Sequence, residues 1–175
     1  MSTHPIFIDN VAFAKKNERL VGSLKLTDCP RLFELLEDAT KNEQSKSSDT
    51  TLISYVLQGN TDAAGQHHLH LALKVTLVTT CQRCLNDMPL ELALNFNYLI
   101  GEVSDIELED GDIDGSDDID LQQASPNMDI IALIEDEIIM AMPIAPIHEK
   151  DCGAIVSQSG EKQNPFAVLK GLIKP

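Results

Sequence analysis

The sequence contains no tryptophan, and aromatic residues make up only 4% of its 175 residues. Proteins that hold single-stranded nucleic acid without regard to sequence stack the bases on aromatic side chains, so RNA binding by stacking is not expected. Basic residues are also scarce, because 13 Lys and Arg stand against 28 Asp and Glu, for a net charge of −15. This charge opposes phosphate binding over the whole surface and fits either a basic protein partner or solubility alone.

Long apolar runs and a secretory leader are missing as well. No run of about 20 apolar residues occurs, which is the length that a membrane-spanning helix needs. Residues 1–5 lack the basic segment that opens a signal peptide, so we expect a cytoplasmic protein. Thiols stay reduced in that compartment, and the four cysteines therefore suggest metal binding, redox chemistry or ordinary burial rather than disulfides.

The length predicts a single domain, residues 1–175, with two polar interruptions. Residues 40–50 have no apolar member and predict a flexible polar loop. Residues 102–123 predict an acidic loop, since 102–120 contain ten acidic side chains and no Lys or Arg. Residues 110–115 imitate the opening of a calcium loop, but Leu121 stands where that loop needs its glutamate, so no calcium site is expected.

Apolar and polar residues alternate most clearly in segments 69–77 and 90–98, which predicts two half-buried antiparallel strands joined by residues 81–89. Segments 20–26 and 52–57 predict further strands, with Gly22 at a bulge or a close approach, and residues 6–13 predict a short strand and its turn. A histidine cluster precedes the first clear strand. Its members could hold a metal, but a polar strand end explains them better; they are His67, His68 and His70.

Three helices are expected. Asp28-Cys29-Pro30 predicts the start of the first, with Cys29 as a buried thiol beside it, and Ser125-Pro126 predicts the start of the second. Asn164-Pro165 predicts the start of a last, short helix. Eleven of the fifteen residues in 128–142 are apolar, so the second helix should be buried on most of its surface, with Glu135 and Glu137 on a solvated or salt-bridged edge. The fold class is therefore α+β: an antiparallel β-sheet packed by a few helices, with a Cys-x2-Cys knuckle between two strands.

The knuckle, Cys81-Gln82-Arg83-Cys84, supplies two thiols at the spacing that zinc sites use. His148 and Cys152 follow the apolar helix and could complete a closed Cys3His site, with zinc as the cofactor. Core or redox thiols remain the alternative reading. A thioredoxin-like motif needs a helix directly after it, whereas residues 86–89 have the composition of a turn, so the redox reading has little physical support.

The chain resembles the YceD family, the large ribosomal RNA subunit accumulation proteins of bacteria. The resemblance rests on the knuckle, on residues 135–148 (EDEIIMAMPIAPIH) and on residues 164–169 (NPFAVL). It implies a role in the synthesis, processing or stability of 23S ribosomal RNA and no established catalytic activity. Some branches of the family have two full cysteine pairs, and His148 stands here in place of one of those cysteines.

Two functional classes follow. The first is a non-catalytic assembly factor that contacts ribosomal RNA or a ribosome-assembly protein. A few residues near the metal ligands and in the tail could form its interaction face; they are Arg83, Lys150, Phe166, Lys170 and Lys174. The second is a metal-dependent enzyme or nuclease acting on ribosomal RNA. That class needs carboxylates fixed around a catalytic metal, and the acidic loop offers no apolar scaffold to fix them.

Overall fold

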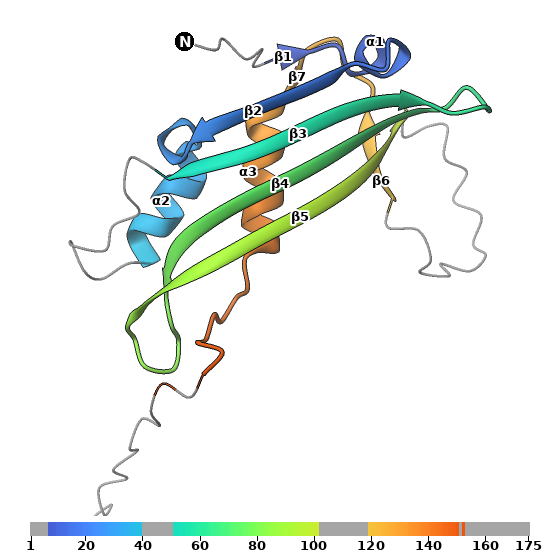
Figure 1. The fold of residues 1–175 in the computed structure, drawn as a ribbon. Helices are drawn as coiled ribbons and strands as arrows, with labels where there is room; N and C mark the ends of the chain where they lie inside the picture. The colour runs from blue at the N-terminus through green and yellow to red at the C-terminus, as the bar shows by residue number, and fades with distance from the viewer. Residues whose placement is uncertain (1–6, 40–50, 102–118, 151, 153–175) are drawn as a thin grey trace, which may run out of the picture.

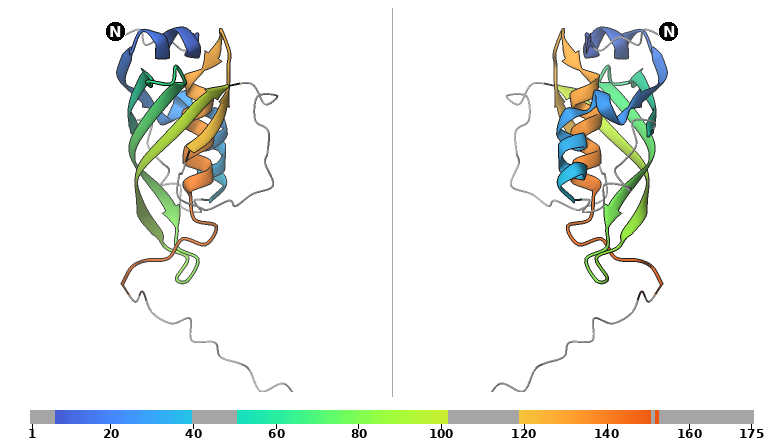
Figure 2. Two further views of the ribbon diagram at one scale, coloured as in Figure 1. Left: turned by 90° about the vertical axis from the view of Figure 1, so that its right-hand side faces the viewer. Right: turned by 90° about the vertical axis from the view of Figure 1, so that its left-hand side faces the viewer.

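The computed structural model describes residues 7–39, 51–101, 119–150 and 152. Its main layer is a five-stranded sheet in the order β2-β3-β4-β5-β6. The strands are β2 (Arg19–Lys25), β3 (Leu52–Thr61), β4 (His67–Thr80), β5 (Asp87–Gly101) and β6 (Ile119–Gln123). Two helices, α2 (Pro30–Ala39) and α3 (Ile130–Ala141), lie side by side on one face of this sheet (Figures 1 and 2). The predicted α+β class is confirmed.

Smaller elements close one end of the sheet. The strand β1 (Phe7–Ile8) pairs antiparallel with β7 (Met128–Asp129), and the helix α1 (Asn10–Lys15) packs near β3 and β4. A short 3-10 helix, η1 (Leu26–Asp28), leads from β2 into α2. None of the described helices has the length and apolar character needed to cross a membrane.

The alternation of apolar and polar residues in the strands decides which face of the sheet packs against the core, as expected. The four leucines and the valine on the inward face of β4, from Leu69 to Leu77, are each at most 4% exposed, and β4 pairs antiparallel with β5 through Leu73 and Leu94. Gly22 in β2 is a close approach, as predicted: a Cβ atom there would lie 2.7 Å from the hydroxyl oxygen of Tyr55. Each pair from β2–β3 to β4–β5 is antiparallel.

Part of the segment expected to be an acidic loop is a strand. Residues 119–123 form β6, which runs parallel to β5 and pairs Leu121 with Leu99. At the sheet edge, Ile119 and Leu121 remain 47% and 36% exposed, so no buried face leaves an alternating pattern in this sequence. Residues 102–118, with the calcium-like segment, and residues 40–50 lie outside the described residues.

Helix boundaries differ from the prediction in two places. Residues 10–15 form α1 rather than a turn, because the Asp9 carboxylate caps it by accepting a hydrogen bond from the N–H of Ala12 at 2.8 Å. The apolar helix does not begin at Ser125-Pro126. It begins at Ile130, where Asp129 accepts from two backbone N–H groups, and β7 occupies the residues just before it. The helix α2 begins at Pro30, as predicted.

The two glutamates of α3 are more buried than a solvated edge would leave them, at 3% exposed for Glu135 and 6% for Glu137. Glu135 is salt-bridged, as one reading expected: it lies 2.9 Å from Nε of Arg31 and accepts a hydrogen bond from the N–H of Leu32 at 2.9 Å. It thus caps α2 from the neighbouring helix. Glu137 instead points to the sheet and accepts a hydrogen bond from the hydroxyl of Tyr98 at 2.7 Å.

Replacing Glu137 by glutamine is expected to raise the free energy of unfolding at neutral pH and to change it little in acid. Burial raises the pKa of the Glu137 carboxyl in the folded protein, and the Tyr98 hydroxyl opposes this. The charges of Asp120 and Asp136 raise this pKa further. Stability is therefore lost as the pH rises from the unfolded pKa through the raised folded pKa, and glutamine escapes this loss. Urea unfolding of both proteins from pH about 4 to about 7 tests this prediction. A difference in the free energy of unfolding that did not change with pH would contradict it.

Candidate metal centre

The hairpin between β4 and β5 carries the two thiols of the knuckle. Strand pairing ends at Thr80 and Asp87, and the turn between them is closed by the N–H of Cys81, which donates to the carbonyl of Asn86 at 2.9 Å. A second bond runs from the N–H of Leu85 to the carbonyl of Cys81 at 2.9 Å, with Leu85 at a φ of 62°. This tight turn places both thiols at the tip of the hairpin.

The other two donor residues come from the chain after α3. The helix ends at Ala141, and Pro143, which follows its C-cap Met142, keeps it from continuing. The N–H of Gln82 then donates to the carbonyl of Pro146 at 2.8 Å, so the hairpin tip holds this segment directly. The residue types do not predict this bond, because a main-chain contact leaves no signature in them.

Four side chains meet where these two segments join: Cys81, Cys84, His148 and Cys152. Their donor atoms all lie within 4.8 Å of one another, and they form a group that could hold a metal ion. The Sγ atoms of Cys81 and Cys152 are 3.8 Å apart, and Sγ of Cys84 lies 3.5 Å from Nδ1 of His148. A tetrahedral zinc ion with ordinary bond lengths separates two sulfurs by about 3.8 Å and a sulfur and a nitrogen by about 3.5 Å. Both measured distances fit.

Two thiols of the metal group, those of Cys81 and Cys152, differ in acidity. Burial of Cys81 works to raise the pKa of its thiol, but hydrogen bonds to the sulfur lower the pKa to about 5; the donors are the backbone N–H groups of Cys84, His148 and Arg83 and the thiol of Cys84. Burial raises the pKa of Cys152 to about 11, and the sulfurs of Cys84 and Cys81 add to this. The main chain of the knuckle is thus arranged to stabilise a thiolate, which is the form that binds metal.

A redox role would need a helix directly after the knuckle to activate its thiols. Cys84 is followed by a turn and then by β5, so none of the described helices begins there. The fourth cysteine, Cys29, is fully buried beside the start of α2, as predicted, and burial raises the pKa of its thiol to about 12. It is an ordinary core thiol.

The histidines before the first clear strand lie apart from this group. His67 is hydrogen-bonded with Thr61 at 3.0 Å, His68 with Asp62 at 3.2 Å, and His70 with Asn97 at 2.9 Å. Within the described ranges, none of them belongs to a group of three or more donors that could hold a metal ion. They occupy a polar strand end, as expected.

The predicted interaction face is described only in part. Arg83 lies in the knuckle turn and is half-buried, while Lys150 is exposed between the two donor residues of the second segment. Both therefore flank the candidate metal group. Phe166, Lys170 and Lys174 lie outside the described residues.

Comparison with known proteins agrees with the resemblance seen in the sequence. Residues 69–173 match the family described as "Large ribosomal RNA subunit accumulation protein YceD", and this range includes all four residues of the metal group. A relative of that name from Haemophilus influenzae is 24% identical over 178 aligned positions, covering 96% of this chain and 95% of the relative. No solved structure matches the chain. Because the matched range exceeds half of its length, the chain belongs to the YceD family.

Proposed function

We propose that the chain is a non-catalytic ribosome biogenesis factor that supports the synthesis, processing or stability of 23S ribosomal RNA. The observation that carries this proposal is the family match over residues 69–173, supported by a relative named for large ribosomal RNA subunit accumulation that aligns along nearly the whole chain. The factor would act as one domain, residues 1–175, in the cytoplasm, through contacts with ribosomal RNA or a ribosome-assembly protein.

The metal group is proposed to hold one structural zinc ion through Cys81, Cys84, His148 and Cys152. Sulfur and imidazole donors in these numbers are the set that structural zinc sites use. The ion would tie the tip of the β4–β5 hairpin to the segment that follows α3, two parts more than 60 residues apart in sequence. The proposed ion would therefore stabilise the fold.

The four protein donors also bear on the enzyme alternative. A catalytic zinc keeps a coordination position open for water or substrate, usually with three protein ligands. Four donors lie within 4.8 Å of one another here, which fills a tetrahedron and supports a structural ion over a catalytic one. Around this ion, the proposed interaction face would include Arg83 and Lys150, with Phe166, Lys170 and Lys174 from the tail.

Cells that lack the protein are expected to contain less 23S relative to 16S ribosomal RNA, and the wild-type gene should restore the ratio. A Cys84→Ala gene should restore it less well, because the loss of one zinc donor weakens the junction between hairpin and helix. Quantifying both RNAs by electrophoresis or sequencing measures this. An unchanged ratio in cells without the protein would remove the proposed role, and cleavage of ribosomal RNA by the purified protein would remove its non-catalytic character.

A further inference from the structure

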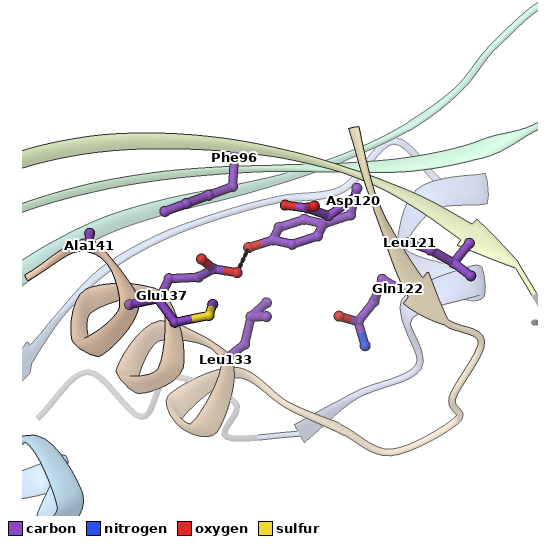
Figure 3. A pocket seen from close by; sticks show the side chains of 9 residues that line it. Phe96, Asp120, Leu121, Gln122, Leu133, Glu137 and Ala141 are labelled. Carbon is purple, nitrogen blue, oxygen red and sulfur yellow. Dashed lines mark hydrogen bonds between the residues drawn. The ribbon is translucent and has the colours of Figure 1, made fainter. Parts of the chain in front are cut away.

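A cavity lies away from the metal group, between α3 and the β5–β6 edge of the sheet. It has a volume of about 500 Å³ and opens to solvent beside the exposed side chain of Met140. Its walls are mainly apolar, with Phe96 on the sheet side and Leu133 on the helix side, as Figure 3 shows. Pockets of this size and character bind small groups through a few polar atoms set among apolar ones.

The polar group inside this cavity is the carboxylate of Glu137. The residue is 6% exposed, and one of its oxygens accepts the hydrogen bond from Tyr98. Among the residues that the structure describes, no other hydrogen bond and no cation reaches this carboxylate. A buried carboxylate normally has a cationic partner or several donors, so its second oxygen can accept a hydrogen bond from a bound donor.

The charge around this position is all of one sign. Asp120, from β6, also lines the cavity, and its charge acts on both Tyr98 and Glu137. Figure 3 shows its carboxylate on the same side of the cavity as Phe96. The aromatic faces of Phe96 and Tyr98, whose ring centres are 6.4 Å apart, add a surface that attracts cations. Both carboxylates and both aromatic rings of the cavity therefore suit a positive ligand.

We propose that this cavity binds a cationic side chain, arginine or lysine, presented by a basic segment of a partner protein. The apolar walls suit the aliphatic stem of such a side chain, and the Glu137 carboxylate suits its charged end. Arginine fits best, because its planar guanidinium can stack on an aromatic ring and pair with a carboxylate at once. The net charge of −15 would draw a basic segment toward the surface.

RNA is the wrong ligand for this cavity. A phosphate would meet two carboxylates and no positive side chain among the described residues that line it. The assignment deepens the proposed function, on which it rests: it identifies the direct partner of the assembly factor as a basic protein, and it places one contact at the junction of α3 with β5 and β6.

The test is the binding of an arginine-rich peptide to the full-length protein, measured by calorimetry near physiological salt. Glu137→Gln keeps the acceptor for Tyr98 and removes the charge, and we expect it to weaken binding about 30-fold. The matched control is Glu34→Gln, which removes one charge from an exposed position on α2 outside the cavity and should leave the affinity within about twofold. A peptide with citrulline in place of arginine should not compete, since citrulline has the same shape without the charge.

Three results would overturn the proposal. Equal binding by the Glu137→Gln and Glu34→Gln proteins would show that only overall charge matters. Competition by an RNA fragment that is lost in Glu137→Gln would make nucleic acid the ligand. Tighter peptide binding after Lys170 and Lys174 are both changed to glutamine would make the chain's own tail the occupant. The 23S ratio in cells separates this failure from that of the proposed function, because a Glu137→Gln gene that fully restores the ratio refutes the cavity's role alone.

Discussion

Substituting Cys84 by alanine is expected to remove about one zinc ion per chain and to lower the free energy of unfolding by about 4 kcal/mol. That figure is the stabilisation that an ion gives the folded state when its free concentration exceeds the dissociation constant a thousandfold. The loss should be large because the ion would join the β4–β5 hairpin tip to the segment after α3, where Cys152 and His148 offer its remaining donors. A strong chelator should have the same effect on the wild-type protein. Elemental analysis and urea unfolding measure the two quantities.

The control for this experiment is Cys29→Ala. It removes a thiol that is also buried but lies in the core beside α2, so the zinc content should remain at about one ion per chain. A wild-type protein that is purified without zinc, and that neither takes up the ion nor changes its unfolding midpoint when zinc is added, would refute the metal proposal. In that case, the four side chains would be ordinary neighbours.

Replacing Glu135 by alanine is expected to lower the free energy of unfolding by about 3 kcal/mol. The carboxylate is 3% exposed and accepts hydrogen bonds from the side chain of Arg31 and from the N–H of Leu32. Alanine leaves that buried N–H without an acceptor at the start of α2 and opens a small cavity between α2 and α3. Urea unfolding measures the loss, and amide hydrogen exchange should show faster exchange in the first turn of α2.

Arg31→Ala distinguishes the cap from the ion pair. The Arg31 side chain is 54% exposed, so its pairs with Glu135 and Asp136 are screened by water, and its removal should lower stability by less than about 1 kcal/mol. Glu135→Gln keeps an acceptor for Leu32 and should fall between the two alanine variants. If Arg31→Ala proved as damaging as Glu135→Ala, the ion pair rather than the cap would hold the two helices together.

Much of the fold could be predicted because burial leaves a periodic record in the sequence. The alternation in 69–77 and 90–98 identified β4 and β5 and the hairpin between them. The apolar residues of 128–142 identified α3, although its first turn was placed too early, because Asp129 caps the helix and Ser125 does not. The strand β6 was not predictable in this way: it is a parallel edge strand whose stability comes from pairing with β5, and pairing leaves no trace in its own residues.

The candidate metal site separates what local sequence can predict from what depends on the tertiary structure. The spacing Cys81-x2-Cys84 and the segment from His148 to Cys152 could be recognised as half-sites, because local spacing fixes which donors can reach one ion. Their meeting could not be deduced from either half: it depends on the position of α3 across the sheet and on the main-chain bond from Gln82 to Pro146.

The sequence by itself determined the fold class, the family and the residues proposed as metal donors, since these depend on residue types and on short spacings. Only the tertiary structure decided that Glu137 is buried against Tyr98, that Glu135 caps a helix from outside it, and that a cavity lined by two carboxylates lies beside β6. The physical reason is that the local sequence around a glutamate in an apolar helix is the same whether water or another element of the fold covers its carboxylate. Burial and pairing are properties of the packed chain.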